Sequence, residues 1–380
     1  MKRFRQESPA LKKCFSNKEI IVGSLCGKVY FIDFETGDSS RSPIDVQNNI
    51  KGTPSLDPLL NGNLYVGQGI PRQEPFGAAT YNLYSHIRTH FQGRDALAWR
   101  QWHAYDASPV RVGDFIFRVG ENGTVYKYYS PNGEMLLHST LRYHSAGRWG
   151  SPGVESSMAV YKNYGYITDN HGHIICFNLN TLQPVWHYNN HDDSDASPVI
   201  EEEDGIPYLY SGCEIDKQHD SINYSYLVKL DARNGQRVWQ QPIPARVVVS
   251  NGHKFEGGLF ATPLLGRGNC KDLIFYNLCV NLPTIGGEFI ALDKHTGKIV
   301  YRTHLKWYPW SSPIALMNEK DEMFVFTGDC QGRVYLIDAK TGEIIFCKLM
   351  ANNFEGSPII IDNHVVVGSR GQEIYRMSIK

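Results

Sequence analysis

Residues 312–346 read SPIALMNEKDEMFVFTGDCQGRVYLIDAKTGEIIF, and this stretch decides the fold of the chain. Four short apolar runs, Ile314–Leu316, Met323–Thr327, Arg333–Asp338 and Glu343–Phe346, alternate with polar or glycine-containing turns. Short apolar runs bounded by turn residues are typical of antiparallel strands. The stretch therefore predicts one antiparallel sheet of four strands.

The last turn of this stretch, Asp338–Gly342, favours one backbone geometry. We expect the Asp338 carboxylate to accept hydrogen bonds from the backbone amides two and three residues further on. Gly342 can adopt the positive φ that a type I turn followed by a bulge requires. Each outer strand should therefore begin immediately after such a turn.

The unit recurs along the chain, which makes it a structural repeat. A Ser-Pro or Thr-Pro dipeptide opens the first apolar run, and the prolines are Pro9, Pro54, Pro109, Pro152, Pro198, Pro263, Pro313 and Pro358. A period of roughly 40–50 residues with four strands per repeat is typical of propeller blades. We therefore predict an all-β, eight-bladed β-propeller of four-stranded antiparallel blades, with residues 1–380 as a single domain.

The last blade is one strand short at its C-terminal end. Its apolar runs are Pro358–Ile361, His364–Gly368 and Glu373–Ile379, and no fourth run follows. Residues 2–7 stand immediately before the first Ser-Pro, where an outer strand belongs. We expect this N-terminal segment to complete the last blade, which would remove an open sheet edge.

Three segments interrupt the repeat. Gln68–Trp102 in the second blade lacks the Asp-x-x-Thr-Gly turn, so this blade is either degenerate or carries an insertion. In the fifth blade the loop Gly212–Tyr226 is expanded, and the insertion Pro244–Gly258 precedes the sixth blade. Long loops on a rigid scaffold are frequent locations of function.

An aromatic residue follows the turn glycine by four positions in three blades, at Trp239, Tyr301 and Phe346. A large ring in an outer strand can cover the seam between neighbouring sheets. We interpret these residues as packing contacts between blades and not as ligand contacts.

Composition excludes several function classes. The net charge is −1, so nothing in the charge balance favours nucleic acid or an anionic membrane. No apolar run approaches the ~20 residues needed to cross a bilayer, so no membrane insertion is predicted. The eight cysteines include no adjacent pair and no C-x-x-C, which predicts free, buried thiols. We expect a monomer.

The N-terminal segment Met1–Gln6 is basic, but no apolar stretch follows it. It does not read as a secretory signal. The sequence as given therefore indicates a cytoplasmic protein, and a periplasmic or extracellular one if it begins inside a longer chain.

The pattern Gly-x-Val-Tyr-x-x-Asp-x-x-Thr-Gly-x-x-x-aromatic is carried best by residues 27–37, 227–239, 287–301 and 332–346. Together with the Ser/Thr-Pro dipeptides it resembles the PQQ-like (quinoprotein) eight-bladed propeller superfamily, a WD40/YVTN-like repeat fold. The resemblance implies one of several activities. Some members are quinone-dependent alcohol or sugar dehydrogenases, others bind no quinone, such as BamB-type outer-membrane assembly lipoproteins, and related propellers are fused to adenylating enzymes.

The dehydrogenases of this superfamily typically carry a Cys-Cys disulfide, a tryptophan floor and a Glu/Asn/Asp calcium site. This sequence has no Cys-Cys, and no residues here match the calcium triad or the catalytic aspartate. We therefore predict neither PQQ nor calcium as a cofactor, and we assign no catalytic residue.

In propellers, the loops from one blade to the next and the loops between second and third strands share one face, where ligands bind. Aromatic and polar groups gather in these loops, and they suit a small molecule, a sugar, a peptide or a protein partner. The alternative to a ligand site is that the loops pack on each other and close the mouth of the channel. The candidate ligand-binding residues are His103, Tyr105, Asp106, His144, Arg148, Trp149, His191, Asp193, Glu256, Trp307, Trp310, Glu355 and Arg370.

The run His191–Asp195 is the densest acidic stretch of the chain. Oxygen ligands at alternate positions can hold calcium, which makes Asp192, Asp193 and Asp195 metal candidates. The run lacks the glycine and the distal glutamate of an EF-hand loop, so a solvated loop is the favoured interpretation. No Gly-x-Ser-x-Gly, P-loop or dinucleotide fingerprint is present.

These observations favour a non-catalytic ligand-binding or protein-interaction scaffold with a funnel on its loop-bearing face. Two alternatives stay open. One is an oxidoreductase or other enzyme that acts at the funnel, and the other is an accessory domain of a larger multidomain protein.

Overall fold

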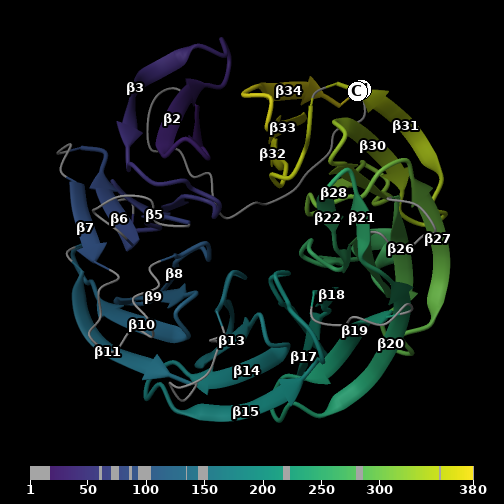
Figure 1. Cartoon of the computed structure of the whole chain (residues 1–380), viewed down its shortest axis with the longest axis horizontal. Coiled ribbons are helices and arrows are strands. Elements are labelled where there is room, and N and C mark those ends of the chain that lie inside the picture. The colour runs from purple at the N-terminus through teal and green to yellow at the C-terminus, as the bar shows by residue number, and fades with distance from the viewer. Residues whose placement is uncertain are drawn as a thin grey trace. The chain divides into compact units, whose positions relative to one another are not determined.

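The computed structural model describes residues 18–59, 62–69, 77–84, 88–92, 104–133, 135–143, 153–216, 223–279, 286–350 and 352–379. Within these residues the regular structure is β-strand, apart from the short 3-10 turn η2 at Gly268–Cys270 (Figure 1). Antiparallel pairing joins consecutive strands into sheets. The predicted all-β class is confirmed.

The first sheets follow the chain in order. The first contains β1 (Glu19–Gly23), β2 (Lys28–Asp33) and β3 (Ser39–Asp45), the second β4 (Ser55–Leu56), β5 (Asn63–Gly67), β6 (Gly77–Asn82) and β7 (Arg88–Gln92), and the third β8 (Val110–Val112), β9 (Phe115–Gly120), β10 (Thr124–Tyr129) and β11 (Leu136–Arg142). The fourth contains β12 (Ala159–Tyr161), β13 (Tyr164–Thr168), β14 (His173–Asn178) and β15 (Pro184–Asn189), and the fifth β16 (Val199–Glu203), β17 (Ile206–Ser211), β19 (Asn223–Asp231) and β20 (Arg237–Ala245).

Three further blade sheets complete the series. The sixth contains β18 (Glu214–Ile215), β23 (Gly257–Gly258), β24 (Leu264–Leu265), β25 (Leu273–Cys279), β26 (Gly287–Asp293) and β27 (Ile299–Leu305), the seventh β28 (Ile314–Met317), β29 (Met323–Gly328), β30 (Arg333–Asp338) and β31 (Ile344–Leu349), and the eighth β32 (Ile359–Ile361), β33 (His364–Gly368) and β34 (Ile374–Ser378). A separate hairpin pairs β21 (Val248–Ser250) with β22 (His253–Phe255). The fold class is that of an eight-bladed β-propeller, as predicted.

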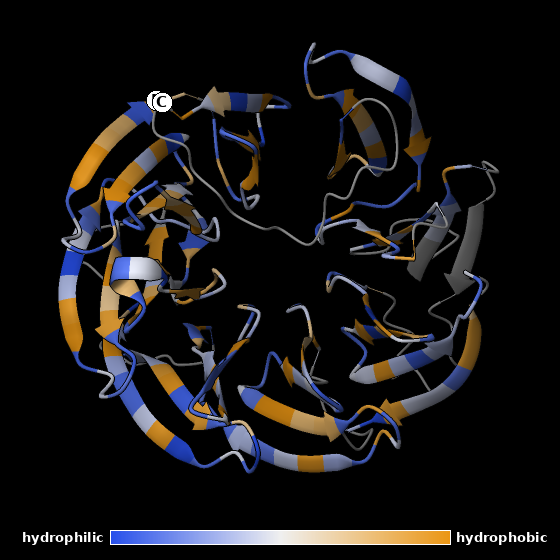
Figure 2. Cartoon of the chain, turned by 180° about the vertical axis from the view of Figure 1, so that it is seen from behind, coloured by the Kyte–Doolittle hydropathy of each residue, from blue (hydrophilic) through white to orange (hydrophobic). Residues whose placement is uncertain are grey.

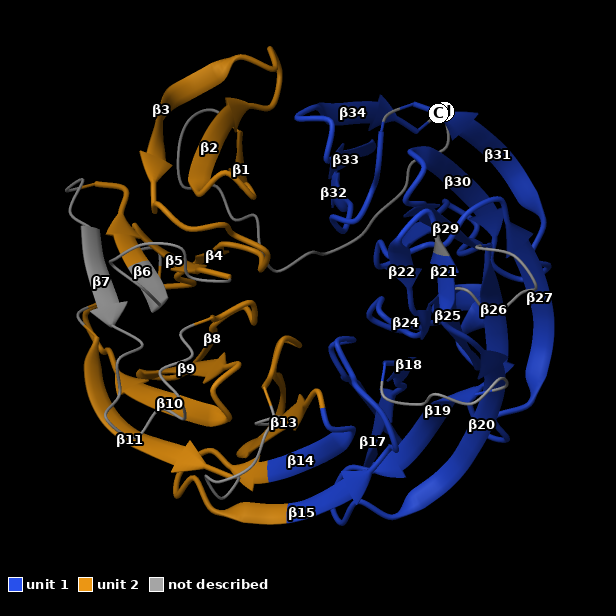
Figure 3. Ribbon diagram, viewed as in Figure 1, with its two compact units in different colours: residues 1–8, 171–176, 186–380 blue, residues 9–170, 177–185 orange. Residues whose placement is uncertain are grey.

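The chain divides into two compact units (Figure 3). Unit 1 comprises residues 1–8, 171–176 and 186–380, and unit 2 comprises residues 9–170 and 177–185. Each unit has its own apolar core: Phe31 and Leu64 are buried in unit 2, and Tyr276 and Phe289 in unit 1. Polar and apolar residues alternate along many of the strands, which is the pattern of half-buried sheets (Figure 2). Among the described residues, no helix has the length and apolar character that a membrane crossing requires.

The turn geometry expected from Asp338 is present. Asp338 Oδ1 accepts hydrogen bonds from the amides of Lys340 and Thr341, both at 2.9 Å, and Gly342 has a φ of 78°. Asp293 Oδ1 makes the same contacts with the amides of His295 and Thr296. Local side-chain chemistry thus sets where the outer strands begin.

The predicted start of the fourth blade was wrong. Ser151 and Pro152 lie outside the described residues, but the first strand of this blade begins only at Ala159. The Ser157 hydroxyl accepts a hydrogen bond from the Ser108 amide at 3.1 Å, as the Ser312 hydroxyl does from the Thr262 amide. Ser157 therefore occupies the repeat position of the serine, and Met158 takes the place of the proline.

The second blade carries an insertion and keeps its strands. β6 and β7 complete a four-stranded sheet after the segment that follows β5. Asn82 replaces the turn aspartate, and its Oδ1 accepts a hydrogen bond from the Tyr84 amide at 3.0 Å. In the eighth sheet the described residues supply three strands, and residues 2–7, which we expect to add the fourth, lie outside the described residues.

The insertions around the fifth blade form additional β-structure. The predicted loop Gly212–Tyr226 contains β18, whose Glu214 pairs with Gly258 of β23, and its last residues already belong to β19. The insertion Pro244–Gly258 contains the β21–β22 hairpin. These elements lie in unit 1, and the insertion carries one of the predicted site residues, Glu256.

Candidate functional site

The predicted site residues fall into separate groups. His103, His144, Arg148 and Trp149 lie outside the described residues. Tyr105 and Asp106 belong to unit 2, and the others belong to unit 1. Within unit 1 the candidates form an acidic group around Asp193, an aromatic group around Trp307, and the pair of Glu355 and Arg370.

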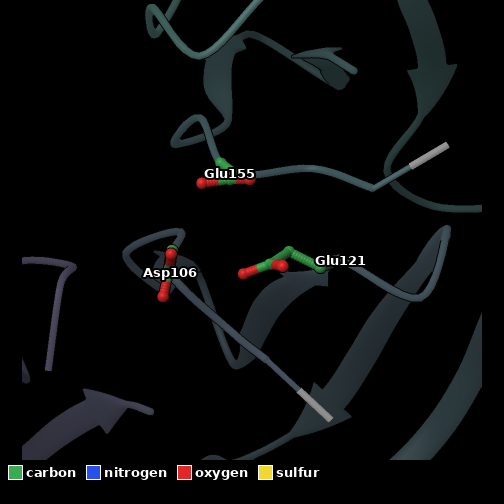
Figure 4. Close-up of side chains that lie close together, drawn as sticks. All are labelled: Asp106, Glu121 and Glu155. Atoms are coloured by element: carbon green, nitrogen blue, oxygen red, sulfur yellow. The ribbon is translucent and has the colours of Figure 1, made fainter. Parts of the chain in front are cut away.

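In unit 2, Asp106 lies close to two carboxylates that the sequence analysis did not join to it. Figure 4 shows Asp106 with Glu121, which follows β9, and Glu155, which precedes β12; one carboxylate oxygen of each lies within 4.8 Å of the others. The ammonium of Lys51 lies 2.7 Å from Asp106 Oδ2 and 3.6 Å from Glu155 Oε2. This cluster therefore contains its own cation.

Burial and charge set the ionisation of this cluster. Burial opposes the charge on Lys51, but the attraction of Asp106 and Glu155 outweighs it and raises the pKa of Lys51 above its usual value. Burial also raises the pKa of Glu155, and the Asp106 charge adds to the effect against the attraction of Lys51. Lys51 compensates part of the negative charge of the cluster, and its ion pairs with Asp106 and Glu155 connect the loops that carry these residues.

Tyr105 lies in the core of unit 2. Its side chain is buried with Tyr65, Ile116, Tyr126 and Tyr128, and its ring centroid lies 5.9 Å from that of Tyr126. Burial raises the pKa of the Tyr105 hydroxyl well above its usual value. The residue supports the loop that carries Asp106.

In unit 1, the acidic stretch joins a buried glutamate that the sequence analysis missed. One carboxylate oxygen from each of Asp193, Asp195 and Glu214 lies within 4.8 Å of the others. Asp193 and Asp195 belong to the loop between β15 and β16, and Glu214 belongs to β18. The Glu214 amide donates a hydrogen bond to the Asp193 carbonyl at 2.8 Å, which holds strand and loop together. The only sequence signal for Glu214 was the high charge of its expanded loop.

The predicted metal candidate Asp192 has a different role in this loop. It is fully buried, and its Oδ1 accepts a hydrogen bond from the Asp193 amide at 2.9 Å. His191 is exposed, has a φ of 77°, and places its ring centroid 4.4 Å from that of Tyr226. Both residues shape the loop that presents Asp193 and Asp195.

Glu256 lies beside this acidic cluster and shares a lysine with Asp216. The Lys254 ammonium lies 2.5 Å from Glu256 Oε1 and 2.9 Å from Asp216 Oδ1. The hydrogen bonds that Lys254 donates to Glu256 and Asp216 raise the pKa of Lys254 above its usual value. The predicted residues Asp193 and Glu256 are therefore parts of one acidic region.

The predicted tryptophans form an aromatic platform, which we define as Phe255, Phe260, Trp307, Tyr308 and Trp310. The Phe255 ring centroid lies 6.4 Å from that of Trp307 and 5.7 Å from that of Tyr308. Trp310 packs on Phe260 at 5.1 Å. All five side chains are partly exposed. The blade-connecting loop after β27 and the segment around β22 and β23 thus supply the platform as two contacting groups, Phe255 with Trp307 and Tyr308, and Phe260 with Trp310.

Glu355 and Arg370 contact each other. They form an ion pair, and Asn353 Nδ2 donates a hydrogen bond to Glu355 Oε1 at 2.8 Å. The Arg370 amide also donates to the Asn353 carbonyl at 2.9 Å. Their charges are compensated locally, between the loop before β32 and the loop after β33.

The described cysteines do not fit the quinone site of the dehydrogenases. The described cysteines are all free thiols, at Cys26, Cys176, Cys213, Cys270, Cys279, Cys330 and Cys347. The predicted burial is wrong for Cys26 and Cys347, which are exposed. Burial raises the pKa of the Cys279 thiol well above its usual value. A buried, protonated thiol without an adjacent partner cannot supply the Cys-Cys disulfide of those enzymes.

The repeat, the sheet order and the turns define an eight-bladed propeller of the PQQ-like class. The family model described as outer membrane protein assembly factor BamB matches residues 85–284 and 286–380, and the chain belongs to this family.

Two curated relatives are similar to parts of the chain. BamB of Kangiella koreensis is 23% identical over 209 residues, which covers 52% of this chain and 44% of the relative. The quinoprotein alcohol dehydrogenase PedH of Pseudomonas putida is 23% identical over 188 residues, or 45% of this chain and 26% of the relative. The chain thus spans less than half the length of each of these relatives.

Solved structures show the same fold at low identity. BamB from Moraxella catarrhalis covers 99% of this chain and 100% of its own, with a TM-score of 0.59 and 15% identity. The computationally designed protein Ika8 covers 96% and 94% at a TM-score of 0.64 and 12% identity. A europium-containing methanol dehydrogenase covers 95% and 80% at a TM-score of 0.61 and 12% identity.

Proposed function

We propose that this chain is a non-catalytic protein-interaction propeller of the BamB-like kind, and that its partner is a protein that binds the aromatic platform. The observation that carries the proposal is the platform itself, in which two groups of partly exposed rings are formed by two loop regions of unit 1. Aromatic rings provide large, rigid contact area at low cost in conformational entropy, and they are enriched where proteins bind each other.

Electrostatics supports a protein partner. The platform residues are uncharged, while Lys254, which precedes Phe255 in the chain, forms ion pairs with Glu256 and Asp216. An apolar centre with a charged border is the usual composition of a protein interface. The family includes proteins named as outer membrane protein assembly factors, so the partner we propose is a protein of such an assembly system or one of its clients.

Under this proposal the chain binds no quinone. The alternative of an oxidoreductase rests on the similarity to PedH and to a methanol dehydrogenase. Fold similarity alone does not carry an activity, and the residues that would complete the quinone site have no counterpart in this sequence.

Site-specific photo-crosslinking in the native host tests the proposal. A benzophenone amino acid replaces Trp307 or Trp310, and the control replaces Val300, which is 52% exposed on β27 of the same blade. We expect one protein to crosslink from positions 307 and 310 and not from position 300. The same crosslink should weaken when Phe255→Ser removes a platform ring. Equal crosslinking from all three positions, or none from 307 and 310, would overturn the proposal.

A further inference from the structure

The two acidic clusters differ in how their charge is compensated. Lys51 places its ammonium directly among Asp106 and Glu155 in unit 2. In unit 1, Lys254 contacts Asp216 and Glu256, and within the described part of the chain it forms no ion pair with Glu214. The Glu214 carboxylate therefore lies among acidic side chains without contacting this lysine.

We propose that Asp193, Asp195 and Glu214 bind a divalent cation, and that this cation is Ca²⁺. Their ligand oxygens lie within 4.8 Å of one another. Ca²⁺ binds oxygen at about 2.3–2.6 Å, so oxygens on opposite sides of one ion are separated by about 4.6–5.2 Å. Three oxygens at most 4.8 Å apart lie within about 2.8 Å of a common point, so one Ca²⁺ can bridge the three carboxylates with small side-chain adjustments.

Glu214 provides the second, independent observation. Glu214 is only 4% exposed, and its Oε2 atom is buried without a hydrogen-bond partner. A buried carboxylate oxygen without a partner loses the solvation it had in water, and a metal ion directly restores that interaction. The orphan oxygen belongs to the carboxylate that completes the three-residue group.

The charged side chains around Glu214 also favour a bound cation. Glu214 is surrounded by the negatively charged side chains of Asp195, Asp193, Glu256 and Asp216. Their combined negative potential favours a bound cation at this position. A divalent cation satisfies several of these carboxylates at once, whereas one proton satisfies a single carboxylate.

The ligand set favours calcium over magnesium. All three protein ligands are carboxylates, and they come from a loop and a two-residue strand. Ca²⁺ accepts six to eight oxygens in variable geometry, while Mg²⁺ requires a nearly ideal octahedron and retains its waters. The sequence alone favoured a solvated loop for Asp192, Asp193 and Asp195. Glu214 changes that interpretation, because it supplies the distal acidic ligand that the local run lacks.

The position of the site suggests what the ion would stabilise. β18 pairs with β23, which follows Glu256 and the β22 residue Phe255 of the aromatic platform. An ion held by Glu214, Asp193 and Asp195 would therefore fasten the insertion to the loop between β15 and β16. A role of the ion in holding the aromatic platform for a partner rests on the proposed function, whereas the metal site itself does not.

Calcium titration of metal-free protein tests the site. Isothermal titration calorimetry with CaCl₂ and with MgCl₂ should show one Ca²⁺ per chain and weaker Mg²⁺ binding, and Ca²⁺ should raise the melting temperature relative to EDTA. Equal affinity for both ions would overturn the assignment to calcium. Absence of both a heat signal and a melting shift at 10 mM CaCl₂ would overturn the site.

Variants assign the binding to these residues. Glu214→Gln and, separately, Asp195→Asn should each weaken Ca²⁺ binding at least tenfold. The matched control is Glu155→Gln, which changes a carboxylate of the lysine-containing cluster and should leave Ca²⁺ affinity unchanged. Equal loss in all three variants, or in none, would contradict the proposal. Crosslinking from Trp307 reports separately on the proposed function, so failure of one experiment does not decide the other.

Discussion

Trp239 donates its indole N–H to the carbonyl oxygen of Lys294 at 2.8 Å, from the outer strand of the fifth blade to the turn of the sixth. Trp186 makes the corresponding contact with the Ala232 carbonyl at 3.0 Å, and Tyr301 with the Ala339 carbonyl at 2.7 Å. The predicted seam role is confirmed for Trp239 and Tyr301. Phe346 has no donor group and is 47% exposed.

The seam contact of Trp239 should contribute measurably to stability. Trp239→Phe keeps an aromatic ring and removes the hydrogen bond to Lys294, which should lower the free energy of unfolding by about 1–2 kcal/mol. Trp239→Ala also removes the packed ring and should cost about 3–5 kcal/mol. Urea denaturation measures both changes. Phe346→Leu is the control and should shift stability by less than about 0.5 kcal/mol; equal effects at both positions would contradict the seam role.

The turn glycine beneath this ring should resist substitution for two reasons. Gly297 has a φ of 70°, and a Cβ added there would lie 2.6 Å from the Trp239 ring. Gly205 has a φ of 80°, and a Cβ there meets nothing within 4 Å. Gly205→Ala should therefore cost about 1–2 kcal/mol of backbone strain. Gly297→Ala should cost about 1–3 kcal/mol more than Gly205→Ala, because the added Cβ overpacks the site against the Trp239 ring. Thermal unfolding measures both losses. Identical losses of stability at the two sites would show that the Trp239 ring moves aside without a cost in free energy.

The ion pair of Lys229 and Glu203 predicts a pH-dependent contribution to stability. Lys229 Nζ lies 2.9 Å from both Glu203 carboxylate oxygens, and the lysine side chain is 2% exposed. Burial raises the pKa of Glu203, but the hydrogen bonds from Tyr210 and Lys229 outweigh it and leave the pKa below its usual value. The carboxylate therefore stabilises the fold above its unfolded pKa of about 4.3, and this contribution is lost as the pH falls through the folded pKa.

Glu203→Gln tests this sign. At pH 7 the variant leaves the buried Lys229 charge without its carboxylate partner and should be less stable than the parent by about 3 kcal/mol. This value is the lower end of the range for broken buried ion pairs, because Glu203 is partly exposed. The difference from the parent should shrink as the pH falls below about 4. Urea denaturation at both pH values measures it. Glu343→Gln, a change at an exposed carboxylate, is the control; a pH-independent difference for Glu203→Gln would contradict the assignment.

Quinone binding distinguishes the proposed function from the enzyme alternative. Purified protein mixed with PQQ and CaCl₂ should show neither a bound quinone absorption band nor dye-linked alcohol oxidation, because the Cys-Cys pair and the calcium triad of the dehydrogenases have no match here. Ca²⁺ alone should still bind at Asp193, Asp195 and Glu214. Stoichiometric bound quinone would favour the oxidoreductase.

The blade architecture could be predicted from the sequence because its signals are local. An aspartate and a glycine four residues apart, such as Asp338 and Gly342, set a turn through contacts within five residues. Strand boundaries in the seventh blade agree with the apolar runs for the same reason. The fourth blade was misplaced because Ser151-Pro152 resembles the dipeptide, while the Ser108 amide selects Ser157 through a contact between neighbouring blades.

The candidate site depended on tertiary structure. Glu214 approaches Asp193 only because its amide bonds the Asp193 carbonyl and its strand pairs with Gly258. Lys51 reaches Asp106 across a longer separation in the chain, and Phe255 reaches Trp307 from another insertion. A repeat determines by itself which residues form strands and turns, because those choices are made by neighbouring residues. Which loop residues meet is decided by long-range pairing and by burial, because these fix where irregular segments are held.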